Sequence, residues 1–329
     1  MSQSAASSKE KCIDGYKYLF NKDLLKGQVA FVTGGGTGIG FTIAEVLMSF
    51  EGCILRGIKN KVSLISLIKI VQHAVRFQSL LLLEKLLANS MDPDQAGLDP
   101  CWSQSHYIRF HMARLSYDFK ICCLFYQPKK VQAAVGEAMR RFGKINFLIN
   151  SAAGNFLCPA EGLSFNAFRT VMDIDTMGTF NTTKVVFDEY MKKHGGVIIN
   201  VTATLQVRGQ VYQLHAGCAK AAIETMTKHL AVEWGEKGIR VMCVAPGPIS
   251  DTEGFSRLGG KTISDEYVKN IPIQRLGKRE DIANTVLYCV SDAAQLLTGT
   301  TVIADGGAWL TSENSLRRVR RIMEMHAKM

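Results

Sequence analysis

The chain has 329 residues, 47% of them hydrophobic and 21% charged, which is enough to bury a sizeable globular core. This composition excludes disordered, collagen-like and heptad-repeat proteins. No stretch approaches about twenty uncharged apolar residues, so we expect no membrane span. The net charge of +10 is not gathered into a basic stripe with interleaved aromatic residues, so we expect no nucleic acid partner. A cofactor and a substrate rich in phosphate would suit the same charge.

The nine cysteines are odd in number and include no Cys-x-x-Cys pair. We therefore expect free thiols in a reducing compartment and no metal site. Residues 1–11 lack an apolar run, which argues against a secretory signal.

Short apolar runs alternate with amphipathic helical patterns along most of the chain. The predicted strands are 28–33, 145–150, 197–202, 239–245 and 300–304. The predicted helices are 39–50, 129–142, 165–192, 214–234 and 279–291. This alternation predicts an α/β fold, a Rossmann-type doubly wound parallel sheet with helices on both faces.

The pattern predicts one Rossmann-type domain at residues 28–313. Residues 1–27 form a predicted N-terminal extension before it, and residues 314–329 form a basic C-terminal tail after it. Within the domain, residues 54–127 break the alternation, and the helical run 62–88 is rich in Leu and Ile. This atypical segment is either a functional insertion or the product of mis-splicing or a faulty gene model.

Residues 34–40 form a glycine-rich loop between the first strand and the first helix. Glycines let the backbone approach a pyrophosphate, and the amide groups at the helix N-terminus attract negative charge. The strand before the loop and the helix after it give the motif its required context. The alternative is a glycine-rich turn without a ligand. The predicted cofactor-binding residues here are Gly34, Gly35, Gly36, Thr37, Gly38, Ile39 and Gly40.

Four motifs give the chain a recognisable resemblance: the glycine loop, Asn-Ser-Ala-Ala-Gly at 150–154, Pro-Gly-Pro-Ile at 246–249 and Ala-Asp-Gly-Gly at 304–307. Together they resemble the short-chain dehydrogenase/reductase family. Longer strings at 153–159, 164–166, 215–220 and 306–310 are similar to the peroxisomal 2,4-dienoyl-CoA reductases within that family. The resemblance covers about residues 12–53 and 128–313. It implies an NADPH-dependent homo-oligomer that reduces 2,4-dienoyl-CoA to 3-enoyl-CoA in the β-oxidation of unsaturated fatty acids.

Most members of this family place a Tyr four residues before a Lys, so that one helical turn aims both at the nicotinamide. Here Ala216 stands four residues before Lys220, and Ala203 stands where the family usually has Ser. The usual acid–base pair for alcohols and ketones is therefore missing. Tyr212 and His215 are nearby alternative acids without the one-turn spacing.

Asp175 occupies the position where the wider family usually has Asn. The resemblance implies that this Asp pairs with Lys220 and that both are catalytic. An ammonium beside a carboxylate can hold the cofactor ribose and orient a water that protonates a dienolate. The alternatives are a helix-surface carboxylate and a solvated lysine.

The resemblance implies further binding residues. On the cofactor side these are Asn150, Lys220, Pro246, Gly247, Pro248, Ile249, Ser250, Asp251 and Thr252. On the acyl-CoA side they are Phe156, Ser164, Phe165, Asn166 and Arg257. The alternatives are core packing for the two Phe residues and a solvated surface position for Arg257.

In the family, a basic residue after the second strand binds the adenosine 2′-phosphate and an Asp after the third strand meets the adenine. Residues 54–127 replace this region, and we expect neither Arg56 nor Asp118 to substitute for those contacts. NADPH preference is therefore implied by the resemblance alone, and we expect lower stability and cofactor affinity than in the family. Two alternatives remain: a catalytically impaired, splice-variant-like protein that retains the fold, and another short-chain enoyl or carbonyl reductase.

The chain ends in Ala327-Lys328-Met329, a small–basic–apolar tripeptide of the Ser-Lys-Leu type. This pattern predicts recognition by the peroxisomal import receptor and a peroxisomal location.

Overall fold

The structure, a computed structural model, describes residues 23–51, 127–257 and 265–311. Most of the predicted N-terminal extension, the atypical segment up to residue 126 and the basic tail with its tripeptide lie outside the described residues. The predictions made for them therefore stay predictions. None of the described helices is long and apolar enough to cross a membrane.

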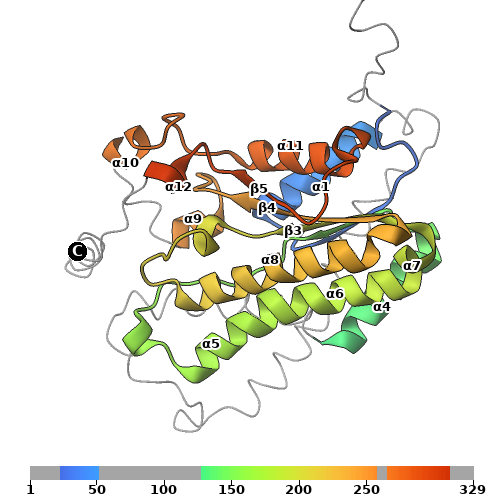
Figure 1. Cartoon of the computed structure of the whole chain (residues 1–329), viewed down its shortest axis with the longest axis horizontal. Coiled ribbons are helices and arrows are strands. Elements are labelled where there is room, and N and C mark those ends of the chain that lie inside the picture. The colour runs from blue at the N-terminus through green and yellow to red at the C-terminus, as the bar shows by residue number, and fades with distance from the viewer. Residues whose placement is uncertain (1–22, 52–126, 258–264, 312–329) are drawn as a thin grey trace, which may run out of the picture.

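Five parallel strands form one sheet in the order β1-β2-β3-β4-β5 (Figure 1). Their bounds are Ala30–Thr33, Phe147–Asn150, Gly196–Val201, Ile239–Pro246 and Thr301–Ala304. Each strand pairs in parallel with the next, so the predicted parallel α/β sheet is confirmed.

The predicted helices are also present. The long ones are α1 (Gly38–Glu51), α4 (Pro128–Phe142), α8 (Leu214–Trp234) and α11 (Arg279–Val290). The predicted helix 165–192 is a succession of α5 (Phe165–Val171), a π-helical turn (Met172–Met177), α6 (Gly178–Val186), a second π-helical turn (Phe187–Met191) and α7 (Lys192–His194). Periodicity did not predict α9 (Glu253–Arg257), α10 (Asp265–Lys269) or α12 (Ala308–Thr311), because about one turn is too short to show a period.

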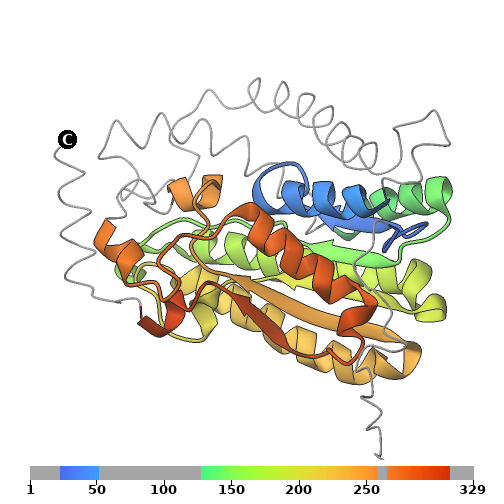
Figure 2. The same cartoon turned by 90° about the horizontal axis from the view of Figure 1, so that it is seen from above.

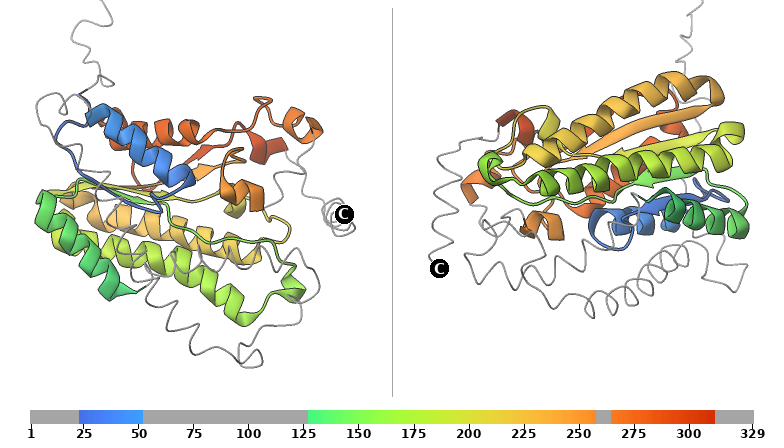
Figure 3. Two further views of the ribbon diagram at one scale, coloured as in Figure 1. Left: turned by 180° about the vertical axis from the view of Figure 1, so that it is seen from behind. Right: turned by 90° about the horizontal axis from the view of Figure 1, so that it is seen from below.

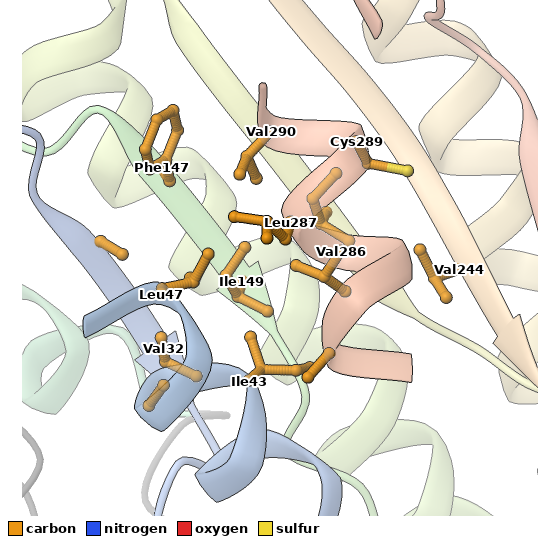
Figure 4. Close-up of a cluster of buried hydrophobic side chains, with 14 of the residues drawn as sticks. Val32, Ile43, Leu47, Phe147, Ile149, Val244, Val286, Leu287, Cys289 and Val290 are labelled. Atoms are coloured by element: carbon orange, nitrogen blue, oxygen red, sulfur yellow. The ribbon is translucent and has the colours of Figure 1, made fainter. Parts of the chain in front are cut away.

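Alternate strand residues face opposite sides of the sheet and build two apolar clusters. Val32, Ile149 and Val244 pack with α1 and α11 on one face (Figure 4). Phe31 and Leu148 pack with α4, α6 and α8 on the other. Figure 2 shows α1 and α11 side by side over the sheet, and Figure 3 shows the opposite layer from behind and from below.

The chain changes face between β1 and β2. The helix after β1, α1, covers one face, whereas the helix before β2, α4, covers the other (Figures 1 and 3). Connections that leave two adjacent parallel strands on opposite faces open a crevice at the carboxyl ends of those strands. The residues that follow β1 and β2 therefore border this crevice, and ligands of open α/β sheets bind in such a place.

Candidate active site

The glycine loop after β1 rests on the segment after β2. Thr33 Oγ1 accepts the N–H groups of Ser151 and Ala152 at 3.1 and 3.3 Å. Gly34 has φ +65°, and a Cβ at this position would lie 2.7 Å from the Ser151 carbonyl carbon. Only glycine fits both the backbone conformation and this contact.

The same loop fits a pyrophosphate. Helix α1 has 14 residues and begins at Gly38, so its first amide N–H groups lack intrahelical partners and point out of the helix. Gly38 has φ +57°, and no atom of the described residues lies within 4 Å of the place where its Cβ would be. The backbone is therefore open to an anionic group at the positive end of α1.

Asp175 and Lys220 form a buried ion pair. Lys220 Nζ lies 3.0 Å from Asp175 Oδ2, and the two residues are 7% and 0% exposed. Lys220 Nζ also donates to the Val201 carbonyl at 3.3 Å, and Asp175 Oδ1 accepts the Gly154 N–H at 2.7 Å. The described residues give Asp175 Oδ2 no aligned hydrogen bond, so a lone pair of this oxygen can accept from a ligand.

Tertiary structure brings together the two residues of this pair and the Gly154 N–H that binds it. Asp175 lies in the first π-helical turn, where one extra residue per turn re-aims the side chains, a feature frequent at functional sites. Lys220 projects from α8, and Gly154 follows β2. Ala216 is buried one turn before Lys220, and it and Ala203 carry only methyl groups, so neither supplies the hydroxyl of the usual Tyr or Ser.

Asn150 belongs to a buried polar network. Its Nδ2 donates to Thr183 Oγ1 at 3.0 Å and to Asn200 Oδ1 at 2.9 Å. Asn200 Nδ2 in turn donates to Thr227 Oγ1 at 2.8 Å. The amide nitrogen of Asn150 thus joins β2 to its neighbours. Its Oδ1 has no hydrogen-bond partner among the described residues and is the atom available to a ligand.

The predicted cofactor residues 246–252 lie at the carboxyl end of β4. A Cβ on Gly247 would lie 2.4 Å from Cβ of Asp305, so glycine is required for the loops after β4 and β5 to meet. Ile249 is buried and Asp251 pairs with Arg279 Nε at 2.8 Å. Thr252 Oγ1 accepts the N–H of Phe255 at the start of α9. These contacts hold the segment beside the sheet edge where the other loops gather.

The predicted acyl-CoA residues differ in environment. Phe156 stacks on His215 with ring centroids 4.2 Å apart, whereas Phe165 is 99% exposed and is not a core residue. Ser164 caps α5 by accepting the Ala167 N–H at 3.1 Å, so its hydroxyl has a structural role as well. Asn166 is exposed on α5, and Arg257 ends α9, where its side chain lies outside what the structure describes.

The sequence analysis missed Glu224. It lies one turn after Lys220 on α8, accepts the Thr202 hydroxyl at 3.2 Å and accepts a short hydrogen bond from Gln206 Nε2. Burial, the largest effect, raises the pKa of Glu224 above its usual value, against smaller opposing effects of its hydrogen bonds and of Lys228. The i, i+4 spacing from Lys220 was the available signal.

Comparison with known proteins identifies the family. Residues 112–308 match the family described as enoyl-(acyl carrier protein) reductase. Peroxisomal 2,4-dienoyl-CoA reductases are 46% identical over 315 residues in Danio rerio (95% of this chain, 92% of the relative) and 45% identical over 321 residues in Rattus norvegicus (97% of both). The chain belongs to the short-chain dehydrogenase/reductase family.

Solved structures agree on the fold. A short-chain dehydrogenase from Bacillus anthracis is 29% identical with a TM-score of 0.61 and covers 88% of this chain and 99% of its own. A 7α-hydroxysteroid dehydrogenase solved with NADH and 7-oxo glycochenodeoxycholic acid has a TM-score of 0.60 at 24% identity, over 90% of this chain and all of its own.

We predict that Glu224→Gln makes stability less sensitive to a rise in pH from acidic to neutral values. Because the folded pKa of Glu224 is raised, its contribution to stability is complete below the unfolded pKa and is lost as pH rises through the folded pKa. The Tm of the variant relative to the wild type should therefore increase between about pH 4 and pH 8.

Glu236→Gln provides the matched contrast. A hydrogen bond to Lys237, with the charge of that lysine second, lowers the pKa of Glu236. The Tm of Glu236→Gln relative to the wild type should therefore fall slightly with rising pH. The change should be small because this carboxylate is exposed. A Tm difference for Glu224→Gln that stays level or falls with rising pH would contradict the role given to burial.

Proposed function

We propose that the protein reduces the conjugated thioester of a 2,4-dienoyl-CoA to the 3-enoyl-CoA with a nicotinamide cofactor. The observation that carries this proposal is the buried Asp175–Lys220 pair in a site whose usual Tyr and Ser positions hold Ala216 and Ala203. A carbonyl reductase needs an acid beside the forming alkoxide. Reduction of a dienoyl thioester instead needs a group that holds the developing enolate and a proton source at carbon.

Lys220 provides the positive charge in this reaction. An ammonium has three donors, and the described residues direct it to the Asp175 carboxylate and the Val201 carbonyl. At least one N–H of the ammonium remains for a ribose hydroxyl or the thioester oxygen, where negative charge gathers in the dienolate. When bound, the nicotinamide cofactor would supply the hydride that adds to the far carbon of the diene.

Asp175 orients the proton source. The Gly154 N–H fixes one carboxylate oxygen, and the other, beside Lys220, keeps an acceptor position. A water that donates one proton to this oxygen presents its second proton to the dienolate carbon, and solvent replaces the proton transferred. The carboxylate thus works by position in a low-dielectric pocket, where such hydrogen bonds are strong.

NADPH is the cofactor we propose. The glycine loop at the N-terminus of α1 supports a dinucleotide, and the names of the related dienoyl-CoA reductases are consistent with NADPH. The residues expected to distinguish NADPH from NADH fall in segment 54–127, nearly all of which lies outside the described residues. A catalytically impaired protein that retains the fold is the second candidate, since this segment departs from the family pattern.

We expect Asp175→Asn and Lys220→Ala each to reduce kcat for a 2,4-dienoyl-CoA by about 10²–10⁴-fold, because each removes one half of the protonation machinery. Steady-state kinetics with NADPH would measure this loss. Breaking a buried pair also destabilises a fold, by about 3–5 kcal/mol, so thermal unfolding is followed in parallel.

Lys184→Ala and Asp188→Ala are the matched controls, since this ion pair lies exposed on the neighbouring helical segment. They should leave turnover unchanged. Near-normal turnover in a folded Asp175→Asn or Lys220→Ala would remove the assignment.

We expect Gly38→Ala to weaken NADPH binding by about tenfold or more, because the methyl group and its altered backbone occupy the space proposed for the pyrophosphate. Gly143→Ala is the control: Gly143 also has positive φ (+68°) and open space, but it lies at the opposite end of the sheet after α4. Fluorescence titrations with NADPH and NADH measure both variants. Absence of NADPH binding to the wild type would favour the impaired protein.

The peroxisome is the location we propose, with support from the names of the related enzymes. A fluorescent tag on the N-terminal side of the whole chain should co-localise with a peroxisomal marker, and removal of residues 327–329 should leave it diffuse. Diffuse signal from the intact chain would contradict the location, and unchanged import after removal would contradict the tripeptide. Self-association stays a prediction of the resemblance.

A further inference from the structure

The segment after β2 is fastened to the segment that begins α8. Asn155 Nδ2 donates to Gln213 Oε1 at 2.7 Å, and Cys158 N donates to the Tyr212 carbonyl at 3.0 Å. His215 adds a third link to this pair of segments, residues 155–158 and 212–215. The links join residues more than fifty positions apart, so tertiary structure alone brings them together.

His215 makes two kinds of contact with Phe156. Its Nε2 lies 3.0 Å from the Phe156 carbonyl oxygen, and its ring stacks on the Phe156 ring with centroids 4.2 Å apart and planes inclined by 25°. A carbonyl oxygen only accepts, so Nε2 must carry the proton of this hydrogen bond. Both the main chain and the side chain of Phe156 are therefore fixed by one imidazole.

The imidazole is held in one state. His215 is completely buried, and its Nδ1 has no hydrogen-bond partner among the described residues. Burial lowers the pKa of His215, against smaller opposing effects of the Phe156 hydrogen bond and of the Asp175 charge. A neutral ring whose proton is already donated to a carbonyl is not an acid for the substrate, so the alternative acid considered from the sequence does not fit this geometry.

Phe156 is also close in sequence to the catalytic carboxylate. Two residues before it, the Gly154 N–H donates to Asp175 Oδ1 at 2.7 Å. A Cβ on Gly154 would lie 3.3 Å from Cδ1 of Ile174, so this backbone passes tightly against the π-helical turn. Within three residues the chain is thus pinned first to Asp175 and then to His215.

We propose that His215 is a positioning residue that holds Phe156 where the acyl thioester binds, and so sets the place of the diene relative to Asp175 and Lys220. This inference rests on the proposed function. It gives a specific role to a residue whose Nε2 is already hydrogen-bonded to the Phe156 carbonyl. It also gives a role to the imidazole that precedes Ala216 in the sequence: His215 supports Phe156 at the acyl site and is not an acid catalyst.

Two substitutions separate the two contacts. His215→Phe keeps a ring to stack on Phe156 but removes the donor, and His215→Gln keeps a donor near the Nε2 position but removes the ring. Loss of one neutral hydrogen bond or one stacking contact is worth about a threefold to tenfold change in binding. KM for a 2,4-dienoyl-CoA should rise by about that factor in each variant and by more in His215→Ala.

The kcat and the Kd of NADPH distinguish a positioning role of His215 from a general loss of folded structure. We expect kcat to stay within about threefold and the Kd of NADPH within about twofold, because the hydride and proton donors are unchanged. His229→Gln and His229→Phe, on the exposed side of the same helix, should match the wild type. An unchanged KM, or a rise in KM matched by a weaker NADPH affinity and a lower Tm, would overturn the proposal.

A test independent of turnover uses the imidazole itself. Nitrogen-15 NMR of the full chain at pH 7.5, with His215→Gln to assign the signal, should show a neutral ring protonated at Nε2. A neutral ring protonated at Nδ1 would reject the hydrogen bond to Phe156, and a ring protonated at both nitrogens would contradict its neutral state. If the wild type binds NADPH but reduces no dienoyl-CoA, the proposed function fails, and the NMR result still decides whether His215 fixes Phe156.

Discussion

Four parallel register pairs, from Ala30–Phe147 to Thr33–Asn150, join β1 to β2 although the flanking Val29 and Asn146 are 117 positions apart. The site depends on this junction. It aligns the carboxyl ends of two strands whose helices cover opposite faces, so the glycine loop and the segment 150–154 meet at one crevice. A shift of register by one residue would turn every apolar side chain of the strand to the wrong face.

Buried polar side chains beneath the crevice are linked by hydrogen bonds. Asn150, Thr183, Asn200 and Thr227 share hydrogen bonds across the strands. These buried hydrogen bonds are costly to break, so they fix the relative position of β2, β3 and α8. Lys220 projects from this same helix, and its Nζ is bonded to the end of β3. Lys220 is therefore positioned by α8 and by the end of β3. Phe156, at the proposed acyl site, is instead positioned by the contacts between residues 155–158 and 212–215.

The buried Asp175–Lys220 pair contributes little to stability alone. The free energy needed to remove two charges from water is about as large as the free energy of their attraction. Its place beside Gly154 after β2 and Val201 at the end of β3, with an acceptor position on Asp175 that no described residue uses, gives the pair a chemical use. The π-helical turn that carries Asp175 has the same character, because its extra residue per turn directs the carboxylate toward Lys220 on α8.

Periodicity alone determined the parallel sheet and most element bounds: the predicted 214–234 coincides with α8, whose buried positions recur every three to four residues. The glycine loop was also readable, since Gly34 and Gly38 are required by backbone geometry that local sequence reports. Asp175 and Lys220 were named through a family resemblance, since no spacing rule links residues 45 positions apart. Tertiary structure alone decided the π-helical turns, the burial of Glu224 and the stacking of Phe156 on His215. These depend on which elements pack together, and a chain read in order contains no record of its long-range contacts.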